Sequence, residues 1–164
     1  MASALKTWGG LALAAALAAP AYAEDGLLTQ KALSLAMAQT IASGAMDSCK
    51  AMGYAVSVAV VDRDGLTMVM LRGDNAGLHT PEGAERKAYT ARTFRGPSAA
   101  FLKRMQTSPD AHASETYSHV LALPGGLPIK AGNDVIGAVG VSGSPGKDDD
   151  CGQAGIDKVK ALLQ

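Results

Sequence analysis

The sequence predicts an α+β domain in which helices cover both faces of an antiparallel sheet, an α/β/α sandwich. Two pairs of short, apolar, β-branched runs are each joined by a glycine-containing turn, as is typical of antiparallel hairpins. Segments with helix-capping residues precede, separate and follow the hairpins, which gives the order αββααββα. No internal repeat or long linker interrupts residues 24–164, so we expect them to form a single domain.

The first predicted helix runs from Thr29 to about Met52 and ends at Gly53. An apolar stripe repeats along it at helical spacing, with polar Gln39 as its only gap. The stripe consists of Leu28, Ala32, Leu35, Ala42, Met46 and Cys49.

The first hairpin follows this helix directly. Residues 54–62 are a continuous apolar run rich in β-branched side chains, which suit a buried strand. A tight turn is predicted at residues 63–65, and residues 66–72 return as the partner strand.

Three hydroxyl residues predict the starts of the middle helices. Thr80, followed by Pro81, is expected to cap a helix that continues to about residue 94. Ser98 is expected to cap a second helix that ends near residue 106, and Ser108 a third of one or two turns.

The second hairpin comprises residues 127–130, a turn at 131–134 and a strand over 135–142, followed by a helix from about Asp149. Gly137 and Gly140 lie inside its long strand. Glycine weakens a strand and is normally retained where another group approaches the backbone closely. The hairpin is therefore predicted to border a ligand or a packed neighbour.

The first 23 residues have the features of a cleaved signal peptide. Lys6 supplies the positive charge, residues 11–19 are apolar but too short to cross a bilayer, and residues 21–23 (Ala-Tyr-Ala) form a cleavage site. We expect the mature chain to begin near Glu24 and to be periplasmic or secreted. The alternative is an uncleaved membrane anchor.

Cys49 and Cys151 are the only cysteines. In an oxidising compartment an even number of cysteines favours pairing. Cys151 begins a second helical stripe that continues through Gly155, Val159 and Leu162, so a bridge is expected to join the end of the first helix to the start of the last. Two unpaired core cysteines are the alternative.

Charge and missing motifs exclude several classes of function. The chain has 15 basic and 15 acidic residues, which argues against nucleic-acid binding and against a polybasic membrane surface, and we expect no stable membrane insertion. No CxxC, HExxH, Walker or GxSxG motif is present. The acidic run 148–150 is interpreted as complementing a helix dipole, with a cation site as the alternative.

Several ordered motifs together resemble the GlcG/HbpS family across the mature chain. They are VSVAVVDRDG, MVMLRGD, RKAYTARTF, LPGGLPI, VIGAVGVSG and CGQAG. The resemblance implies a profilin-like or PAS-like sheet of about five antiparallel strands, and a homo-oligomer. Several members of the family bind heme, others are related to corrinoid adenosyltransferases, and many have no established activity, so the resemblance specifies the fold better than the function.

A heme site needs an apolar slot, axial ligands to the iron, and donors for two propionates. With the resemblance in view, His79 is the candidate iron ligand, and Arg86 and Lys87 are candidate propionate donors. Tyr89 is a candidate for stacking or hydrogen bonding, although core or interface packing is its alternative. His112 and His119 are alternative ligands.

The sequence therefore predicts an exported heme-binding protein that stores, scavenges, senses or slowly degrades heme. The ligand is expected between the His79 helix and the glycine-rich hairpin, whose start includes Gly125 and Gly126. The alternative is an oligomeric accessory protein that binds a non-heme small molecule, such as a corrinoid, without catalysis. No acid, base or nucleophile is identified, so binding is favoured over enzymatic activity.

Overall fold

Four antiparallel strands form the middle layer of the molecule, in the order β2-β1-β4-β3. The computed structural model describes residues 26–164, so the predicted signal peptide lies outside the described residues. The strands are β1 (Ser57–Val61), β2 (Thr67–Arg72), β3 (Gly126–Ala131) and β4 (Asp134–Ser142). β1 pairs with β2 in the first hairpin and β3 pairs with β4 in the second. The two hairpins are joined by pairing between β1 and β4.

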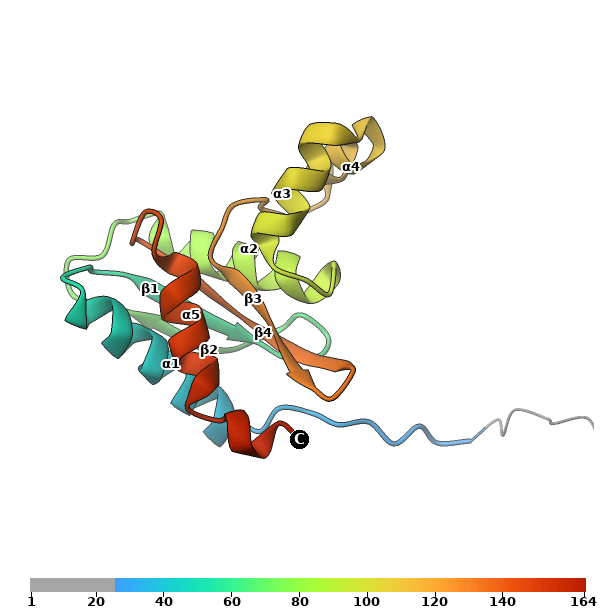
Figure 1. The fold of residues 1–164 in the computed structure, drawn as a ribbon, viewed down its shortest axis with the longest axis horizontal. Helices are drawn as coiled ribbons and strands as arrows, with labels where there is room; N and C mark the ends of the chain where they lie inside the picture. Colours follow the sequence, from blue (N-terminus) through green and yellow to red (C-terminus); the bar gives the residue numbers. More distant parts are fainter. Residues whose placement is uncertain (1–25) are drawn as a thin grey trace, which may run out of the picture.

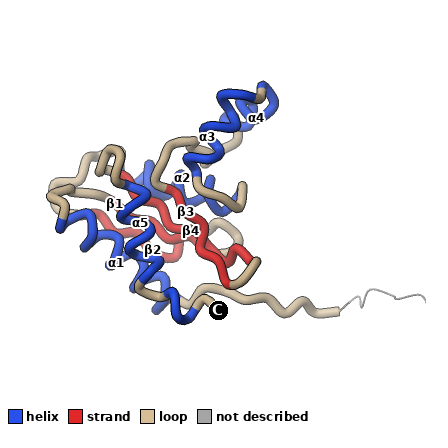
Figure 2. The backbone as a smooth tube through the Cα atoms, in the orientation of Figure 1, coloured by secondary structure: helices blue, strands red, loops and turns tan. Residues whose placement is uncertain are grey.

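Helices cover both faces of this sheet (Figures 1 and 2). α1 (Leu35–Ala51) and α5 (Asp148–Asp157) pack together on one face, and α2 (Thr80–Thr93) covers the other. α3 (Ser98–Thr107) and α4 (Pro109–Ala113) project away from the sheet, as Figure 1 shows in yellow. Two short 3-10 helices, Ser114–Thr116 and Lys160–Leu162, follow α4 and α5.

The predicted α/β/α sandwich and both hairpins are confirmed. The described residues form four strands rather than about five. The two hairpins in the sequence account for all four, and the larger number came from the family resemblance alone. At the first turn the Asp62 carboxylate accepts hydrogen bonds from the amides of Asp64 and Leu66, at 2.8 and 2.9 Å. This local bonding explains why the turn was predictable.

α1 begins six residues later than predicted. The Ser34 hydroxyl caps the helix by accepting a hydrogen bond from the Met37 amide at 3.3 Å, so Leu35 is its first residue. Leu28 lies before the helix and is 81% exposed, so the first part of the expected stripe is not part of the core. The end of α1 at Gly53, which has φ +84°, is as predicted.

Two of the three expected caps are wrong. Thr80 lies inside α2, and its hydroxyl donates to the Gly77 carbonyl at 2.8 Å while meeting the Ser57 hydroxyl of β1. The Ser98 hydroxyl accepts from the Gly126 amide at 2.9 Å and so ties α3 to the start of β3. In both cases a tertiary partner has replaced the local capping bond. Ser108 caps α4 as predicted.

The face under α1 and α5 holds the larger hydrophobic core, built from branched side chains such as Ile41, Val58 and Val139. Cys49 and Cys151 form a disulfide across it, with 5.4 Å between their Cα atoms, which confirms the predicted pairing. α5 ends at Asp157, so its helical spacing does not continue to Leu162, which is 69% exposed. Val159 nevertheless remains buried. The second apolar stripe is therefore shorter than expected.

The opposite face has a core of small residues, mainly alanines of α2, β1 and β4. A Cβ atom added at Gly140 would lie against the Ala84 carbonyl and 2.7 Å from the Ala88 nitrogen. The group that approaches the glycine-rich strand is therefore the backbone of α2. Of the two predicted neighbours, a ligand or a packed element, the structure shows the packed element.

Candidate functional site

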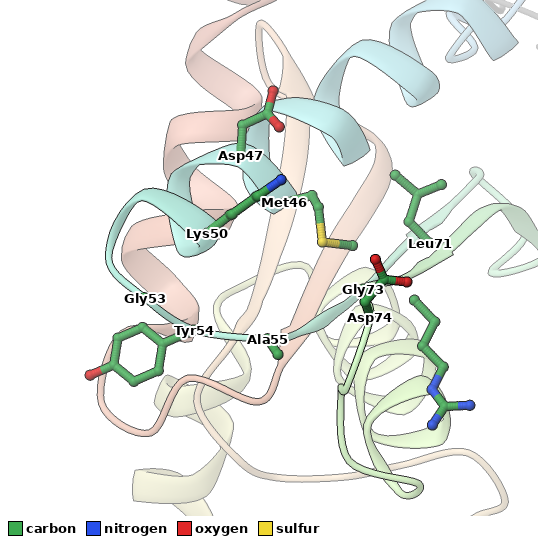
Figure 3. Close-up of a pocket in the computed structure, with 10 residues that line it drawn as sticks. Met46, Asp47, Lys50, Gly53, Tyr54, Ala55, Leu71, Gly73 and Asp74 are labelled. Atoms are coloured by element: carbon green, nitrogen blue, oxygen red, sulfur yellow. The ribbon is translucent and has the colours of Figure 1, made fainter.

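A cavity of about 560 Å³ lies where the C-terminal half of α1 faces the end of β2 (Figure 3). Its walls come from three segments of the chain: α1, the loop that leads into β1, and the end of β2 with its following loop. The lining residues are Met46, Asp47, Lys50, Gly53, Tyr54, Ala55, Leu71, Arg72, Gly73 and Asp74.

Local chain geometry brings these segments together. The Tyr54 amide donates to the Cys49 carbonyl at 3.0 Å, so the chain reverses tightly after α1 and stays beside it. The Gly73 amide donates to the Val56 carbonyl at 2.9 Å and holds the end of β2 against the start of β1. Met46 and Lys50 are one helical turn apart and therefore share the α1 wall.

The cavity combines apolar walls with groups that bind metals and anions. Met46 provides a thioether and Tyr54 a phenol, both of which are known iron ligands in heme proteins. Figure 3 shows Met46 reaching from α1 toward β2, with Tyr54 on the far side from Leu71. Lys50 and Arg72 add positive charge, and the Arg72 guanidinium is steadied by a hydrogen bond of 3.0 Å to the Ala76 carbonyl.

Two carboxylates, Asp47 and Asp74, also line the cavity, so its charge is mixed rather than purely basic. Within residues 26–164 neither forms an ion pair with Lys50 or Arg72. The cations therefore remain available to an acidic ligand. The described residues contain no group of three His, Cys, Asp or Glu side chains placed to hold a metal ion.

His79 lies outside the cavity, five residues after Asp74, which lines it. It is exposed and forms the N-terminal boundary of α2 without a side-chain capping bond. Its imidazole folds back over Gly77, where an added Cβ would lie 3.0 Å from the ring. The structure thus places His79 on the loop that connects the cavity to α2.

The two basic candidates on α2 differ in their surroundings. Arg86 is partly exposed, pairs with Glu82 at 3.0 Å and donates to the Val120 carbonyl at 2.8 Å. Lys87 is buried, and its ammonium pairs with Asp148 at 2.7 Å and donates to the Val141 carbonyl at 3.0 Å. Two of its three donors are therefore used to join α2 to β4 and α5. Asp148, interpreted from sequence as a dipole complement, is the partner in this buried pair.

Tyr89 is brought together with His119, one of the two alternative ligands. Their ring centroids are 5.5 Å apart at an angle of 48°. His119 has φ +67°, a left-handed conformation that is uncommon for a residue with a side chain. His112 lies elsewhere, exposed on α4 and 4.0 Å from Glu115. Sequence reasoning did not pair Tyr89 with His119, because the two are thirty residues apart in the chain.

Gly125 and Gly126 are both buried against protein atoms. The Gly125 amide donates to the Asp149 carboxylate at 2.8 Å. A Cβ added at Gly126 would overlap the Lys87 carbonyl and approach the Ser98 hydroxyl at 2.9 Å. The interval between α2 and the hairpin, where the ligand was expected, is thus filled by close packing. An open cavity lies instead between α1 and β2, and sequence reasoning missed it because Met46 was interpreted as core filling and Tyr54 as part of a strand.

The comparisons with known proteins agree with this architecture. A family model described as "Haem degrading protein HbpS-like" matches residues 33–157. The chain belongs to this HbpS-like family. The structure of a double mutant of Streptomyces reticuli HbpS is 36% identical with a TM-score of 0.76, covering 90% of this chain and 98% of that one.

Two further relatives place the chain within the HbpS-like family. The structure of a PduOC:heme complex is 27% identical with a TM-score of 0.70, over 78% of this chain and 95% of that one. Protein GlcG of Escherichia coli K12 is 29% identical over 114 residues, which are 70% of this chain and 84% of GlcG. The predicted GlcG/HbpS membership is therefore confirmed.

Proposed function

We propose that this protein binds heme in the cavity between α1, β2 and the loop into β1. The observation that carries the proposal is the donor set of that cavity: a thioether, a phenol and two cations around an apolar wall. Its volume of about 560 Å³ is within the usual range for small-molecule sites. Membership of the HbpS-like family and the likeness to the PduOC:heme complex support heme as the ligand.

We assign a role in heme binding to each of several lining residues. Met46 is the proposed iron ligand, because its side chain reaches from α1 toward β2, whereas the Tyr54 ring extends away from Met46 and contributes to the lining alone. Lys50 and Arg72 receive the propionates, and Leu71 provides apolar contact. Bound heme would supply the redox chemistry, while the protein supplies binding, orientation and charge.

His79, on the loop that connects the cavity to α2, is the alternative iron ligand. Its exposure and its place on the loop that follows the cavity-lining residue Asp74 support this role. Arg86, Tyr89 and His119 would then extend the site along α2. The two arrangements make different predictions for substitutions.

Export and self-association belong to the same proposal. The disulfide between Cys49 and Cys151 supports folding in an oxidising compartment, and thus a periplasmic or secreted protein. β2 is an edge strand with exposed Met70, and exposed Leu66 directly precedes it, which supports a homo-oligomer that covers this edge. No described helix is long and apolar enough to cross a bilayer.

The test is a titration of the mature protein with hemin, followed by the Soret band. The wild type is expected to give a shifted, saturable band. Met46→Leu should weaken binding by about tenfold and change the band position, since the iron loses a ligand. Met52→Leu, at an exposed methionine just beyond α1 and outside the cavity, is the matched control and should behave as wild type.

The other outcomes discriminate among the proposals. A changed band in His79→Ala, with Met46→Leu unaffected, would move the iron site to the α2 loop. Absence of any saturable band would reject heme, and a corrinoid titration would then test the non-heme alternative. Loss of the bound Soret band with ascorbate and catalase, with a linear tetrapyrrole formed, would show that heme is degraded.

A further inference from the structure

Three arginines converge at the end of the molecule where α2 stops. Arg63 comes from the β1–β2 turn, Arg92 from the last turn of α2, and Arg95 from just beyond it. Together with the β3–β4 turn at Asn133 and Asp134 they line a cavity of about 80 Å³. None of them lines the cavity proposed for heme, and none lies near His79 in the sequence.

The positive charge at this place is largely unpaired. Within residues 26–164 no carboxylate lies within ion-pair distance of any of the three guanidinium groups. The Nε of Arg92 is buried and has no hydrogen-bond partner among the described residues. A buried donor without a protein partner is costly, so Arg92 would be stabilised by an acceptor that enters this cavity from solution.

The backbone supports the same conclusion. Arg95 has φ +55°, a region normally occupied by glycine at this position after a helix. An arginine here accepts strain that glycine would avoid. Burial, together with the like charges of Arg63 and Arg95, lowers the pKa of the Arg92 guanidinium, against the opposing effect of Asp64 and Asp62. Clustering these cations is therefore unfavourable unless an anion joins them.

We propose that the Arg63–Arg92–Arg95 cavity binds a doubly charged phosphoryl group. A planar guanidinium group can donate two parallel N–H bonds to two oxygens of a phosphoryl group, and it stays charged at all physiological pH values. The small volume suits a free phosphate ion or the terminal phosphoryl group of a small molecule rather than a bulky ligand. Asp134 is the only acidic lining residue, and it opposes the anion.

The experiment is calorimetric titration of the heme-free mature protein with inorganic phosphate, and separately with glycerol phosphate, at constant ionic strength set by chloride. Saturable binding of both identifies the phosphoryl group as the recognised unit. Binding of inorganic phosphate alone restricts the site to the free ion. Arg92→Gln and Arg95→Gln should each weaken binding by about tenfold.

Two substitutions make the test decisive. Asp134→Asn removes the opposing charge and should tighten phosphate binding several-fold, an effect that loss of folding cannot imitate. Lys103→Gln, which removes one exposed positive charge from α3, should leave binding unchanged. Equal weakening by Lys103→Gln, or no effect of the two arginine variants, would overturn the proposal. Hemin titration of Arg95→Gln should match the wild type, so the two proposals fail independently.

Discussion

The two faces of the sheet are covered in different ways. Under α2, alanines and glycines bring helix and strand backbones into direct contact, as at Gly140 and Ala84. Under α1 and α5, branched side chains such as Ile41 and Val139 fill a deeper core that a disulfide crosses. Close backbone packing leaves no room for added volume, whereas a side-chain core can adjust by small shifts. Contacts between helix and sheet should therefore tolerate added volume less well under α2 than under α1 and α5.

The strongest test of this difference is Gly140→Ala. Its new methyl group would meet backbone atoms of α2 that cannot move independently, so we expect destabilisation by more than about 4 kcal/mol, or no cooperative unfolding at all. Urea denaturation followed by circular dichroism measures it. Gly96→Ala, where the nearest atom is 3.8 Å away, is the control and should change little. A near-native Gly140→Ala would contradict the proposed close packing.

Loss of the disulfide tests the other face. The bridge closes a loop with a sequence separation of 102 residues, for which the chain-entropy model gives a stabilisation of about 4.7 kcal/mol. The double variant Cys49→Ala/Cys151→Ala should lose about this much, and dithiothreitol should lower the stability of the wild type similarly. Dithiothreitol should leave the double variant unaffected. Unchanged stability in both experiments would mean that the bridge is energetically neutral.

The buried pair of Lys87 and Asp148 joins the two helical layers. Lys87→Met leaves a buried carboxylate without its cation and should cost about 3 kcal/mol in the free energy of unfolding. Lys87→Met/Asp148→Asn should recover part of this loss, because no uncompensated charge remains and the amide oxygen can still accept from the amide and hydroxyl of Ser144. Lys147→Met, at an exposed pair with Asp150, is the matched control and should leave the free energy of unfolding nearly unchanged, because solvent screens this pair. If the double variant were no more stable than Lys87→Met, the loss could not be attributed to the uncompensated carboxylate.

The smallest effect is expected at Gly152→Ala, on the α1 and α5 side. Its added Cβ would meet the Leu127 side chain at 3.3 Å and two valine methyl groups at greater distance, all of which can shift. Alanine also favours the interior of α5 by about 1 kcal/mol over glycine. Thermal denaturation should show a stability within about 1 kcal/mol of wild type. A loss comparable to that of Gly140→Ala would erase the contrast between the faces.

Local signals made much of the fold predictable. The hairpins follow from apolar runs and turn residues, and Asp62 shows that a single side chain can fix such a turn. The helices start at Thr80 and Ser98 as predicted, but the capping role of these residues was mispredicted because their hydroxyls bond to partners distant in sequence. Lys87 reads as a surface residue, and its partner Asp148 is 61 positions further along. Such contacts between residues distant in sequence cannot be predicted from local sequence patterns.

The candidate site was less predictable than the fold. Its donors come from α1, from the loop into β1 and from the end of β2, and no motif links them. Met46 fits an apolar stripe equally well whether it fills the core or lines a cavity. The arginine cavity was also missed, because Arg63, Arg92 and Arg95 meet only once both hairpin turns are placed around the end of α2.

The position of the disulfide has a practical consequence for limited proteolysis. Cys49 and Cys151 enclose all four strands and the projecting α3–α4 segment, whose own small cluster includes Phe101 and Met105. A protease that cuts this exposed segment would leave two fragments, each holding half of the sheet. They would migrate as one species on a non-reducing gel and separate only after reduction. A nicked molecule should thus keep its shape and its ligand cavity while its chain is no longer continuous.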